Sequence, residues 1–573
     1  VVMALTPIPA GVVFLVSQLG MLPATVVFVN AGTQLGELRS VSGILSADLV
    51  LSLSLLGLFP LLARFLVPRL RDRRVLAAWE RPAAFDRNLV VIGGGSAGLV
   101  SAYIAATVKA RVTLVERAAM GGDCLNTGCV PSKALIRSAR VMADARRAEA
   151  LGFRRIDVEV DFAAVMERVR RVIGRIAPHD SVERYTALGV ECLQGQATVR
   201  SPWEVAVDGR VLRTRGIVIA TGAAPVVPDI PGLADVVHYT SETVWSLREL
   251  PRRLLVLGGG PVGCELAQCF ARFGADTTLV EMTDQLLPRE DPPVAALVRE
   301  ALEADGVRVL TGHRAGTFEQ DVHGQRAHCT AVADGAASTI GFDAVLLALG
   351  RRPRWQGMGL EALGIEAGAG GTIAVNEYLQ TRVPTIFACG DVAGPYQFTH
   401  AAAHQAWYAS VNALFGQFRR FRVNYAVLPA VTFTDPEVAR VGLNEHEARE
   451  RGVDYELTDY DLADLDRAIA EEAGAGTVRV LTPPGRDRVL GATIVGPHAG
   501  ELITEFVTAM KADHGLDHIL GTIHAYPTLA EANRFVAGNW KRRHAPERLL
   551  TLVQRYHRGR LGGGAKKDRS MAV

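Results

Sequence analysis

The sequence predicts an α/β protein with two copies of a strand–turn–helix–strand unit, preceded by an apolar N-terminal segment. The 573 residues exceed the roughly 250–300 that one hydrophobic core supports, so several domains are expected. A formal net charge of +2 gives no overall attraction to nucleic acid, and 49% hydrophobic residues exclude a disordered chain. Three patterns refine this fold class: an apolar start, a repeated glycine motif and a cysteine pair.

The first 63 residues carry only three charged side chains, Glu37, Arg39 and Asp48. The run Leu49–Ala63 is uncharged, and with its apolar neighbours it approaches the ~20 residues that a bilayer requires. We therefore expect transmembrane helices within 1–74, then a linker over 75–87. The following cations favour the cytoplasm for the rest of the chain; they are Arg64, Arg69, Arg71, Arg73 and Arg74.

Two alternatives to a membrane segment stay open for this N-terminal region. One is a signal peptide, which the missing basic region before the first apolar run disfavours. The other is a buried hairpin of two globular helices. Because Val1 is not Met, we also expect the chain to be incomplete at its N-terminus.

A strand, a glycine turn, a helix and a second strand ending in glutamate occur twice. In both copies 23 residues separate the first glycine from the acid, Gly93 from Glu116 and Gly258 from Glu281. The three glycines of a copy are expected to make a tight turn, to let the backbone approach a pyrophosphate and to allow close helix–strand packing. In order, they are Gly93, Gly95 and Gly98 in the first copy and Gly258, Gly260 and Gly263 in the second.

Two dinucleotide sites are therefore expected, one for each copy. Glu116 and Glu281 are placed to accept hydrogen bonds from a ribose 2′-hydroxyl, and a carboxylate there repels a 2′-phosphate. The second site is expected to prefer NADH to NADPH. A nearby cation, Arg289, would weaken that preference.

The cysteine pair lies in the segment GGDCLNTGCVPSK. Pro131 suits the first turn of a helix and places Cys129 at the helix N-terminus, where the dipole lowers a thiol pKa. Lys133 follows one turn later, so both side chains can face the same cofactor. Two ordinary buried cysteines are the alternative, and no metal site is expected because no second Cys/His pair accompanies this one. The other cysteines are expected to be packing residues: Cys192, Cys264, Cys269, Cys329 and Cys389.

The cysteine segment resembles the redox-active segment of the flavin-dependent pyridine nucleotide–disulfide oxidoreductases. Three further motifs extend this resemblance along the chain: ATG at 220–222, LALGR at 347–351 and ACGDVAG at 388–394. That family includes lipoamide dehydrogenase, glutathione reductase and mercuric reductase. The resemblance implies Rossmann-like FAD and NAD domains and an α+β dimerisation domain, in a homodimer. The implied order begins with the first part of the FAD domain at 88–240, the NAD domain at 241–344 and the second part of the FAD domain at 345–424. The dimerisation domain at 425–545 and a basic tail at 546–573 follow.

The resemblance also implies residue roles. Cys124 would be the exposed thiol that attacks the substrate, and Cys129, its redox disulfide partner, would lie against FAD. Lys133 would lie near flavin N5 with Glu265 as its partner, and Asp391 would bind the ribityl chain. The remaining cofactor contacts would be Ala197, Thr221 and Gly222 for FAD and Gly350 for the nicotinamide nucleotide.

The sequence departs from the family at its C-terminal His-Pro-Thr motif, which reads HAYPTLAE here. Tyr526 occupies the histidine position, and Glu531 is retained. Tyrosine, with a pKa near ~10, donates a proton more readily than it accepts one, which favours reduction of an oxidised substrate; His524 is an alternative base. Mercuric reductase also has tyrosine there, but its C-terminal cysteine pair is missing after Cys389. The family's gate tyrosine is replaced by Pro261.

The N-terminal sequence VSQLGMLPATVVFVNAGTQLGEL, followed by SGILS, resembles the C-terminal half of the DedA-like, SNARE-associated membrane domain over residues 1–67. A domain of this kind would attach the oxidoreductase to a membrane. At the other end, Leu549–Arg560 is expected to be a solvated basic tail, with a membrane-surface helix as the alternative.

Taken together, these patterns predict a membrane-anchored, FAD-dependent NADH oxidoreductase that reduces a thiol-reactive or metal-ion substrate. In its homodimer, Tyr526 and Glu531 would act at the partner's active site. Two other functions stay open: an NADH:quinone flavin dehydrogenase that bypasses the cysteines, and a membrane transport or lipid-handling protein whose flavin domain senses NADH.

Overall fold

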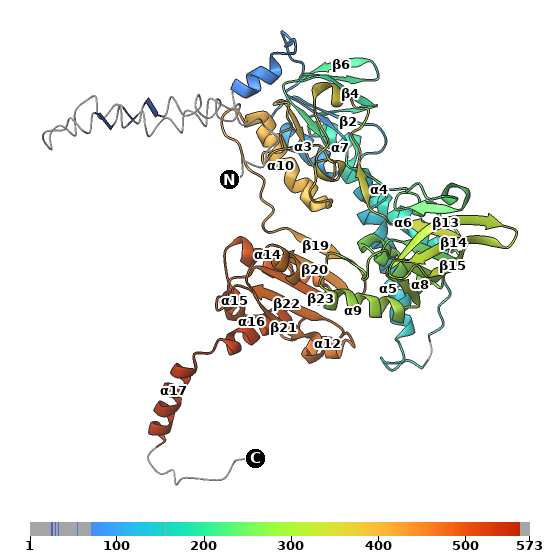
Figure 1. The fold of residues 1–573 in the computed structure, drawn as a ribbon, viewed down its shortest axis with the longest axis vertical. Helices are drawn as coiled ribbons and strands as arrows, with labels where there is room; N and C mark the ends of the chain where they lie inside the picture. The colour runs from blue at the N-terminus through green and yellow to red at the C-terminus, as the bar shows by residue number, and fades with distance from the viewer. Residues whose placement is uncertain are drawn as a thin grey trace. The chain divides into compact units, whose positions relative to one another are not determined.

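The chain divides into two units, Val1–Ala83 and Ala84–Val573, and Figure 1 labels the helices and strands of the second. All strands of the described part of the chain belong to the second unit. The computed structural model describes residues 25, 26, 29, 32, 33, 54, 70–154 and 156–561.

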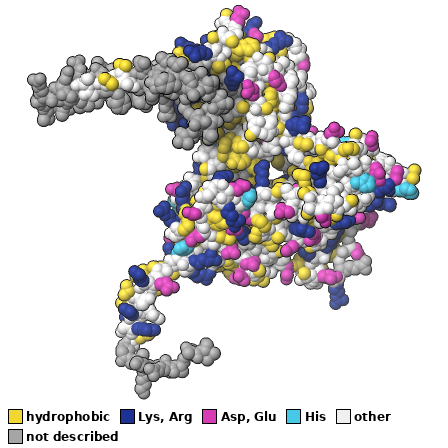
Figure 2. Space-filling view, viewed as in Figure 1, with side chains coloured by type: hydrophobic (Ala, Val, Ile, Leu, Met, Phe, Trp, Pro, Cys, Tyr) yellow, Lys and Arg dark blue, Asp and Glu magenta, His cyan; other side chains and the backbone are white. Residues whose placement is uncertain are grey.

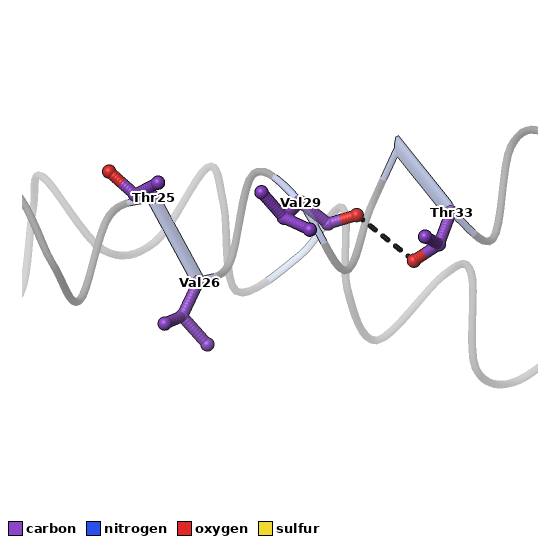
Figure 3. A pocket seen from close by; sticks show the side chains of 4 residues that line it. All are labelled: Thr25, Val26, Val29 and Thr33. Carbon is purple, nitrogen blue, oxygen red and sulfur yellow. Dashed lines mark hydrogen bonds between the residues drawn. The ribbon is translucent and has the colours of Figure 1, made fainter.

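Only short stretches of the first unit are described. The Thr33 hydroxyl donates a hydrogen bond to the Val29 carbonyl at 2.9 Å, and these residues line a hollow with Thr25 and Val26 (Figure 3). The predicted membrane run 49–63 and most of the DedA-like segment lie outside the described residues. Among the described helices, none combines the length and the apolar character needed to cross a bilayer.

The second unit begins with a five-stranded parallel sheet. Its strand order is β18 (Ile386–Ala388), β7 (Ile217–Ile219), β1 (Leu89–Ile92), β2 (Val112–Glu116) and β3 (Val190–Gln194). All four residues of β1 are apolar and buried, as expected for a parallel strand that is covered on both faces. The register pairs Leu89 with Val112 and Ile92 with Val115.

A second five-stranded parallel sheet repeats this arrangement. Its order is β12 (Val307–Leu310), β11 (Asp276–Val280), β10 (Arg253–Leu257), β16 (Ala344–Leu347) and β9 (His238–Thr240). Since all five strands fall between β7 and β18 in sequence, the second sheet is inserted into the chain that forms the first.

Among the residues that the structure describes, eight α-helices accompany the strands of the two sheets in sequence. They are α3 (Ser96–Thr107), α4 (Gly122–Asn126), α5 (Cys129–Arg146), α6 (Phe162–Ile176), α7 (Val182–Ala187), α8 (Pro261–Phe273), α9 (Pro292–Ala304) and α10 (Thr399–Phe415). α3 and α8 each follow the central strand of one sheet, and α10 packs on α3. α5 packs against both α6 and α8. The rings of Phe162 and Phe270, 5.8 Å apart, join α6 to α8 in a shared apolar core.

Three small antiparallel sheets extend these domains. They are β4 (Ala197–Ser201) with β5 (Glu204–Val207) and β6 (Arg210–Arg213), β8 (Ala223–Pro225) with β17 (Arg351–Pro353), and β13 (His313–Asp321) with β14 (Gly324–Ala331) and β15 (Ala337–Phe342). The β8–β17 pair joins a segment just after β7 to one just after β16, so it links the two parallel sheets at the ends of their strands.

The C-terminal domain is an antiparallel sheet covered by helices. Its strand order is β19 (Pro429–Thr432), β20 (Glu437–Gly442), β23 (Gly491–Gly496), β22 (Thr477–Thr482) and β21 (Glu456–Asp461). Its helices are α11 (Glu445–Glu450), α12 (Asp466–Ala470), α13 (Ala499–Leu502), α14 (Thr504–Lys511), α15 (Leu516–Gly521), α16 (Glu531–Arg543) and α17 (Glu547–Arg560). Phe506 and Trp540 anchor its apolar core. The predicted α/β fold with two parallel sheets is confirmed.

Candidate active site

Both glycine turns are closed so tightly that a side chain would not fit. Gly93 has φ +108°, and an added Cβ would lie 2.3 Å from a neighbouring carbonyl oxygen; Gly258 has φ +103° and a corresponding distance of 2.5 Å. At the third glycine of each turn, an added Cβ would lie 1.7 Å from a carbonyl oxygen at Gly98 and 1.9 Å at Gly263. These positions therefore require glycine.

The second glycine of each turn faces open space. An added Cβ at Gly260 meets no atom within 4 Å, and at Gly95 the nearest atom is the Gly122 Cα at 3.7 Å. Gly95 and Gly260 are the N-caps of α3 and α8, without a side-chain capping bond and without an acidic residue in the first turn. Helix N-termini of this kind bind phosphate, so the residues present fit a dinucleotide diphosphate at both turns.

The acid at the end of β2, Glu116, and the acid directly after β11, Glu281, also hold their glycine turns. Glu116 accepts hydrogen bonds from the backbone N–H of Gly94 at 2.5 Å and of Ala118 at 2.7 Å. Glu281 accepts one from Gly259 N–H at 2.6 Å, together with the N–H and hydroxyl of a nearby threonine. The Glu281 oxygen bonded to Gly259, and both oxygens of Glu116, accept one hydrogen bond each and so keep a lone pair for a ribose hydroxyl.

The cysteine pair lies at the junction of α4 and α5. Cys124 is in α4 and half-buried, Cys129 is the first residue of α5 and exposed, and both are free thiols. The expectation that Cys124 is the exposed thiol of the pair is therefore wrong for this structure, because α4 half-buries Cys124 while Cys129 lies at the open start of α5. The hydrogen bond from Cys124 is the largest cause that lowers the pKa of Cys129 to about 6, and Thr399 and Lys133 lower it further. The same hydrogen bond and burial raise the pKa of Cys124. At neutral pH one proton is therefore shared by the pair, with the negative charge on Cys129.

Thr399 is a site residue that the sequence reasoning missed. Its hydroxyl, at the start of α10, lies 3.3 Å from the Cys129 sulfur. The two residues are 270 positions apart in the chain, so no spacing rule connects them. The one available signal is that Thr399 closely follows the ACGDVAG segment, which ends at Gly394.

The structure brings Lys133 and Glu265 together. The Lys133 ammonium donates to the Glu265 carboxylate at 2.9 Å, and the second carboxylate oxygen accepts from the Phe433 N–H at 2.9 Å. The Lys133 nitrogen also lies 4.2 Å from the centre of the Phe433 ring. Glu265 is buried on α8, so this ion pair links the second glycine turn to the helix that carries Cys129.

Asp391 lies in a partly buried group of charges. Burial raises its pKa to about 6, against the opposing effect of Arg351. Arg351 lies 3.8 Å from Asp391 and 2.9 Å from Asp123, next to Cys124 in α4. A carboxyl group with this pKa can accept or donate a hydrogen bond, which suits contact with a polyhydroxyl chain.

The other predicted cofactor contacts are dispersed around the β8–β17 ribbon and its neighbours. Thr221 donates its hydroxyl to the Arg354 carbonyl, and the Arg354 N–H donates to the Gly222 carbonyl at 3.0 Å. Gly350 precedes β17 with φ +90°. Ala197 is buried at the start of β4, in a separate three-stranded sheet. Thr221 also adjoins the first glycine turn, since a Cβ added at Gly93 would lie 3.1 Å from the Thr221 Cα.

The C-terminal motif shows contacts that the sequence did not predict. Tyr526 is 71% exposed, and its hydroxyl donates to Asp466 at 3.0 Å, which raises the pKa of Tyr526. Glu531 is buried and accepts from the Thr528 N–H at 3.3 Å. Within one chain, the Tyr526 hydroxyl is therefore bonded to Asp466 and not to Glu531.

His524 has its own acidic partner. Its Nε2 lies 3.0 Å and 3.2 Å from the two oxygens of Glu505, and Asn533 also donates to this carboxylate at 2.9 Å. The Nδ1 atom lies 3.1 Å from the Thr522 carbonyl. With both ring nitrogens engaged inside the domain, His524 is held as part of the α14–α16 packing.

The isolated cysteines lie in packed environments. Cys264, Cys269, Cys329 and Cys389 are buried, and burial is the largest cause of the raised pKa of each thiol. Cys192 is half-buried, with a raised pKa of the same origin. Their thiols are therefore protonated at neutral pH and distinct from Cys129.

Known proteins share this fold and these motifs. A mercuric reductase of Bacillus cereus is 32% identical over 80% of this chain and 72% of that protein. A dihydrolipoyl dehydrogenase of Thermus scotoductus is 35% identical over 78% of this chain and 95% of that protein. The solved structure of the HOCl-induced flavoprotein disulfide reductase RclA from Escherichia coli has a TM-score of 0.70 and 28% identity, covering 79% of this chain and 99% of that one.

Two family matches cover most of the second unit. Residues 87–406 match the family described as pyridine nucleotide-disulphide oxidoreductase, and residues 428–535 match its dimerisation domain. Members of this family use FAD and NAD(P)H, and the C-terminal domain supports a homodimer. The chain belongs to the pyridine nucleotide-disulphide oxidoreductase family.

Proposed function

We propose that the protein reduces a thiol-reactive or metal-ion substrate, with Cys124 as the attacking thiol and Cys129 as the thiol next to FAD. The observation that carries this proposal is the position of Cys129 at the first turn of α5, with its pKa lowered to about 6. Bound FAD, held by the first glycine turn, Glu116 and Asp391, would supply hydride transfer between NADH and the cysteine disulfide.

The shared proton determines how the dithiol would react. Cys124 holds the proton and donates it to the Cys129 thiolate, so Cys129 accepts that proton as Cys124 attacks an electrophile. With a disulfide substrate, Cys124 forms a mixed disulfide and expels one substrate thiolate; Cys129 then attacks the Cys124 sulfur and expels the second, and the proton that Cys129 had taken up passes to one of them. The products are the Cys124–Cys129 disulfide, one substrate thiol and one substrate thiolate, and a proton from water converts the thiolate to the second thiol.

Two relatives guide the choice of substrate. One is named for mercuric ion reduction, and RclA has been solved as a Cu(II) complex. We therefore propose a thiol-binding metal ion or a disulfide as the oxidant. The test is NADH consumption by the flavin-loaded full chain with mercuric ion, cupric ion, disulfides and quinones, offered separately.

The matched variants are Cys124→Ala and the control Cys329→Ala, a buried cysteine in β14. Turnover with the true oxidant is expected to fall by at least about a hundredfold in Cys124→Ala and to stay unchanged in the control. NADH:quinone turnover that survives Cys124→Ala would instead support the flavin dehydrogenase that bypasses the cysteines.

We also propose that Tyr526 and Glu531 act in trans in the homodimer. The exposure of Tyr526 and its bond to Asp466 leave the ring available at the domain surface. Mixed dimers of Cys124→Ala and Tyr526→Ala subunits would then regain one working site, about half of wild-type activity if Tyr526→Ala alone is inactive. No gain on mixing would contradict action in trans.

Membrane attachment rests on the sequence alone. We propose that the partial DedA-like domain, residues 1–74, inserts into a membrane and leaves the oxidoreductase in the cytoplasm, because an uncharged run precedes five arginines. The protein should stay with membranes washed in alkaline carbonate. Release into the wash would contradict insertion.

A further inference from the structure

Helix α17 lies beyond the part of the chain that matches the family, which ends at residue 535. None of the fourteen residues of α17 is buried. Figure 2 shows hydrophobic and basic side chains side by side along this helix, which Figure 1 labels. An exposed helix with a contiguous apolar face is typical of an interaction surface.

One face of α17 is apolar. Leu549, Leu552, Val553 and Tyr556 follow the i, i+3, i+4, i+7 spacing that places side chains on the same face of a helix. All four are exposed, by 39% to 59% of their surface. Leu550 adds a further exposed leucine beside this face.

The rest of α17 is strongly basic. The helix carries four arginines and one acid, which is Glu547 at its first residue. Arg548 and Arg555 lie one heptad apart, so they follow the same edge of the apolar face. At its end, the Arg560 guanidinium lies 5.8 Å from the centre of the Tyr556 ring. Long arginine side chains in these places reach headgroup phosphates while their stems pack on apolar surface.

We propose that α17 binds flat on the surface of a membrane that contains anionic lipids. Its length is about 21 Å, shorter than a bilayer-spanning helix, and its polar face excludes a fully inserted position. Apolar side chains would enter the headgroup boundary, and the arginines would contact lipid phosphates. This contact is independent of the N-terminal segment, because it uses a different part of the chain.

Peptide-resolved hydrogen exchange on the full chain tests this proposal. The peptides from α17 are measured separately from those of the N-terminal segment, so membrane binding by that segment does not obscure the result. The protein is mixed with vesicles of phosphatidylcholine alone or of phosphatidylcholine with phosphatidylglycerol. Amides of 547–560 should exchange about tenfold more slowly with the anionic vesicles only, and high salt should remove this protection. Equal exchange with both vesicle types would overturn the proposal.

Charge variants identify the cause of the protection. Arg548→Gln, Arg555→Gln and Arg558→Gln together should abolish it. The matched control, Arg170→Gln, Arg171→Gln and Arg175→Gln, removes the same charge from exposed positions of α6 and should keep it. Protection that appears without vesicles and grows with protein concentration would show that a second copy of the chain covers the face, and would also overturn the proposal.

Discussion

The helices α3 and α8 begin in the same way and differ in what they carry. Each starts at the second glycine of its turn and packs closely through the third glycine. α3 has no charged side chain. α8 buries three polar side chains, Glu265, Gln268 and Arg272. The nucleotide turn is thus common to both, while the helix after it differs.

The buried polar residues of α8 connect three parts of the structure. Glu265 binds Lys133 on α5. Gln268 exchanges hydrogen bonds with the backbone of Asp435 at 2.8 and 2.9 Å, and Arg272 lies 2.8 Å from both Asp305 and Asp435. The second nucleotide helix therefore also fixes the cysteine helix and the C-terminal domain, whereas α3 holds only its own domain.

The largest expected effects come from filling the open side of each turn. Gly95→Val should abolish flavin binding, since its side chain would occupy the space of the diphosphate. Gly260→Val should keep the flavin and raise the KM for NADH by at least about tenfold. Flavin absorbance per protein and NADH titration measure both. If the two variants lose the same cofactor, the two turns do not have separate ligands.

Removing the Arg272 charge should destabilise the whole second unit. Arg272→Met would leave Asp305 and Asp435 without their buried cation, at a cost of roughly 3–5 kcal/mol in the free energy of unfolding. The control is Arg299→Met in the exposed Arg299–Glu303 pair, with an expected change below about 1 kcal/mol. Chemical denaturation measures both; equal losses would remove the distinction between α8 and an ordinary surface helix.

A smaller effect is expected at the ion pair between α5 and α8. Lys133→Met should destabilise the protein by about 1–2 kcal/mol, because Glu265 loses its partner while part of the site stays solvated. It should also raise the pKa of Cys129, since Lys133 stabilises the thiolate. Lys133→Arg should keep most of both properties. Thiol titration of the reduced protein measures the Cys129 pKa. An unchanged Cys129 pKa in Lys133→Met would contradict the role of Lys133 in stabilising the thiolate.

The smallest predicted effect concerns Thr399. Thr399→Val removes the hydroxyl next to Cys129 and should raise the Cys129 pKa by less than about one unit, with less thiolate at neutral pH as a result. Thr399→Ser keeps a hydroxyl and should behave like wild type. Thiolate absorbance measured against pH gives the Cys129 pKa of each variant. An equal rise of this pKa in Thr399→Ser would show that packing around residue 399, and not its hydroxyl, causes the effect.

Local patterns predicted the nucleotide units, because a glycine turn, a helix and an acid at fixed spacing lie within one continuous segment. The cysteine pair and Lys133 were predictable for the same reason. Contacts between distant segments could not be predicted in this way. Thr399 lies near Cys129 because β18, which precedes α10, pairs with the first sheet, and Asp466 contacts Tyr526 across the C-terminal domain. The contacts of α8 with Asp435 depend on domain packing, which no spacing in the sequence shows.

The Cys129 thiolate is the central claim, and a pH titration of the reduced, flavin-loaded protein tests it most directly. A thiolate next to bound flavin gives a long-wavelength absorbance band. The band should be present at neutral pH, disappear with a midpoint near the Cys129 pKa of about 6 as pH falls, and be absent in Cys129→Ser. A band that is missing at neutral pH, or that persists in Cys129→Ser, would contradict the assignment.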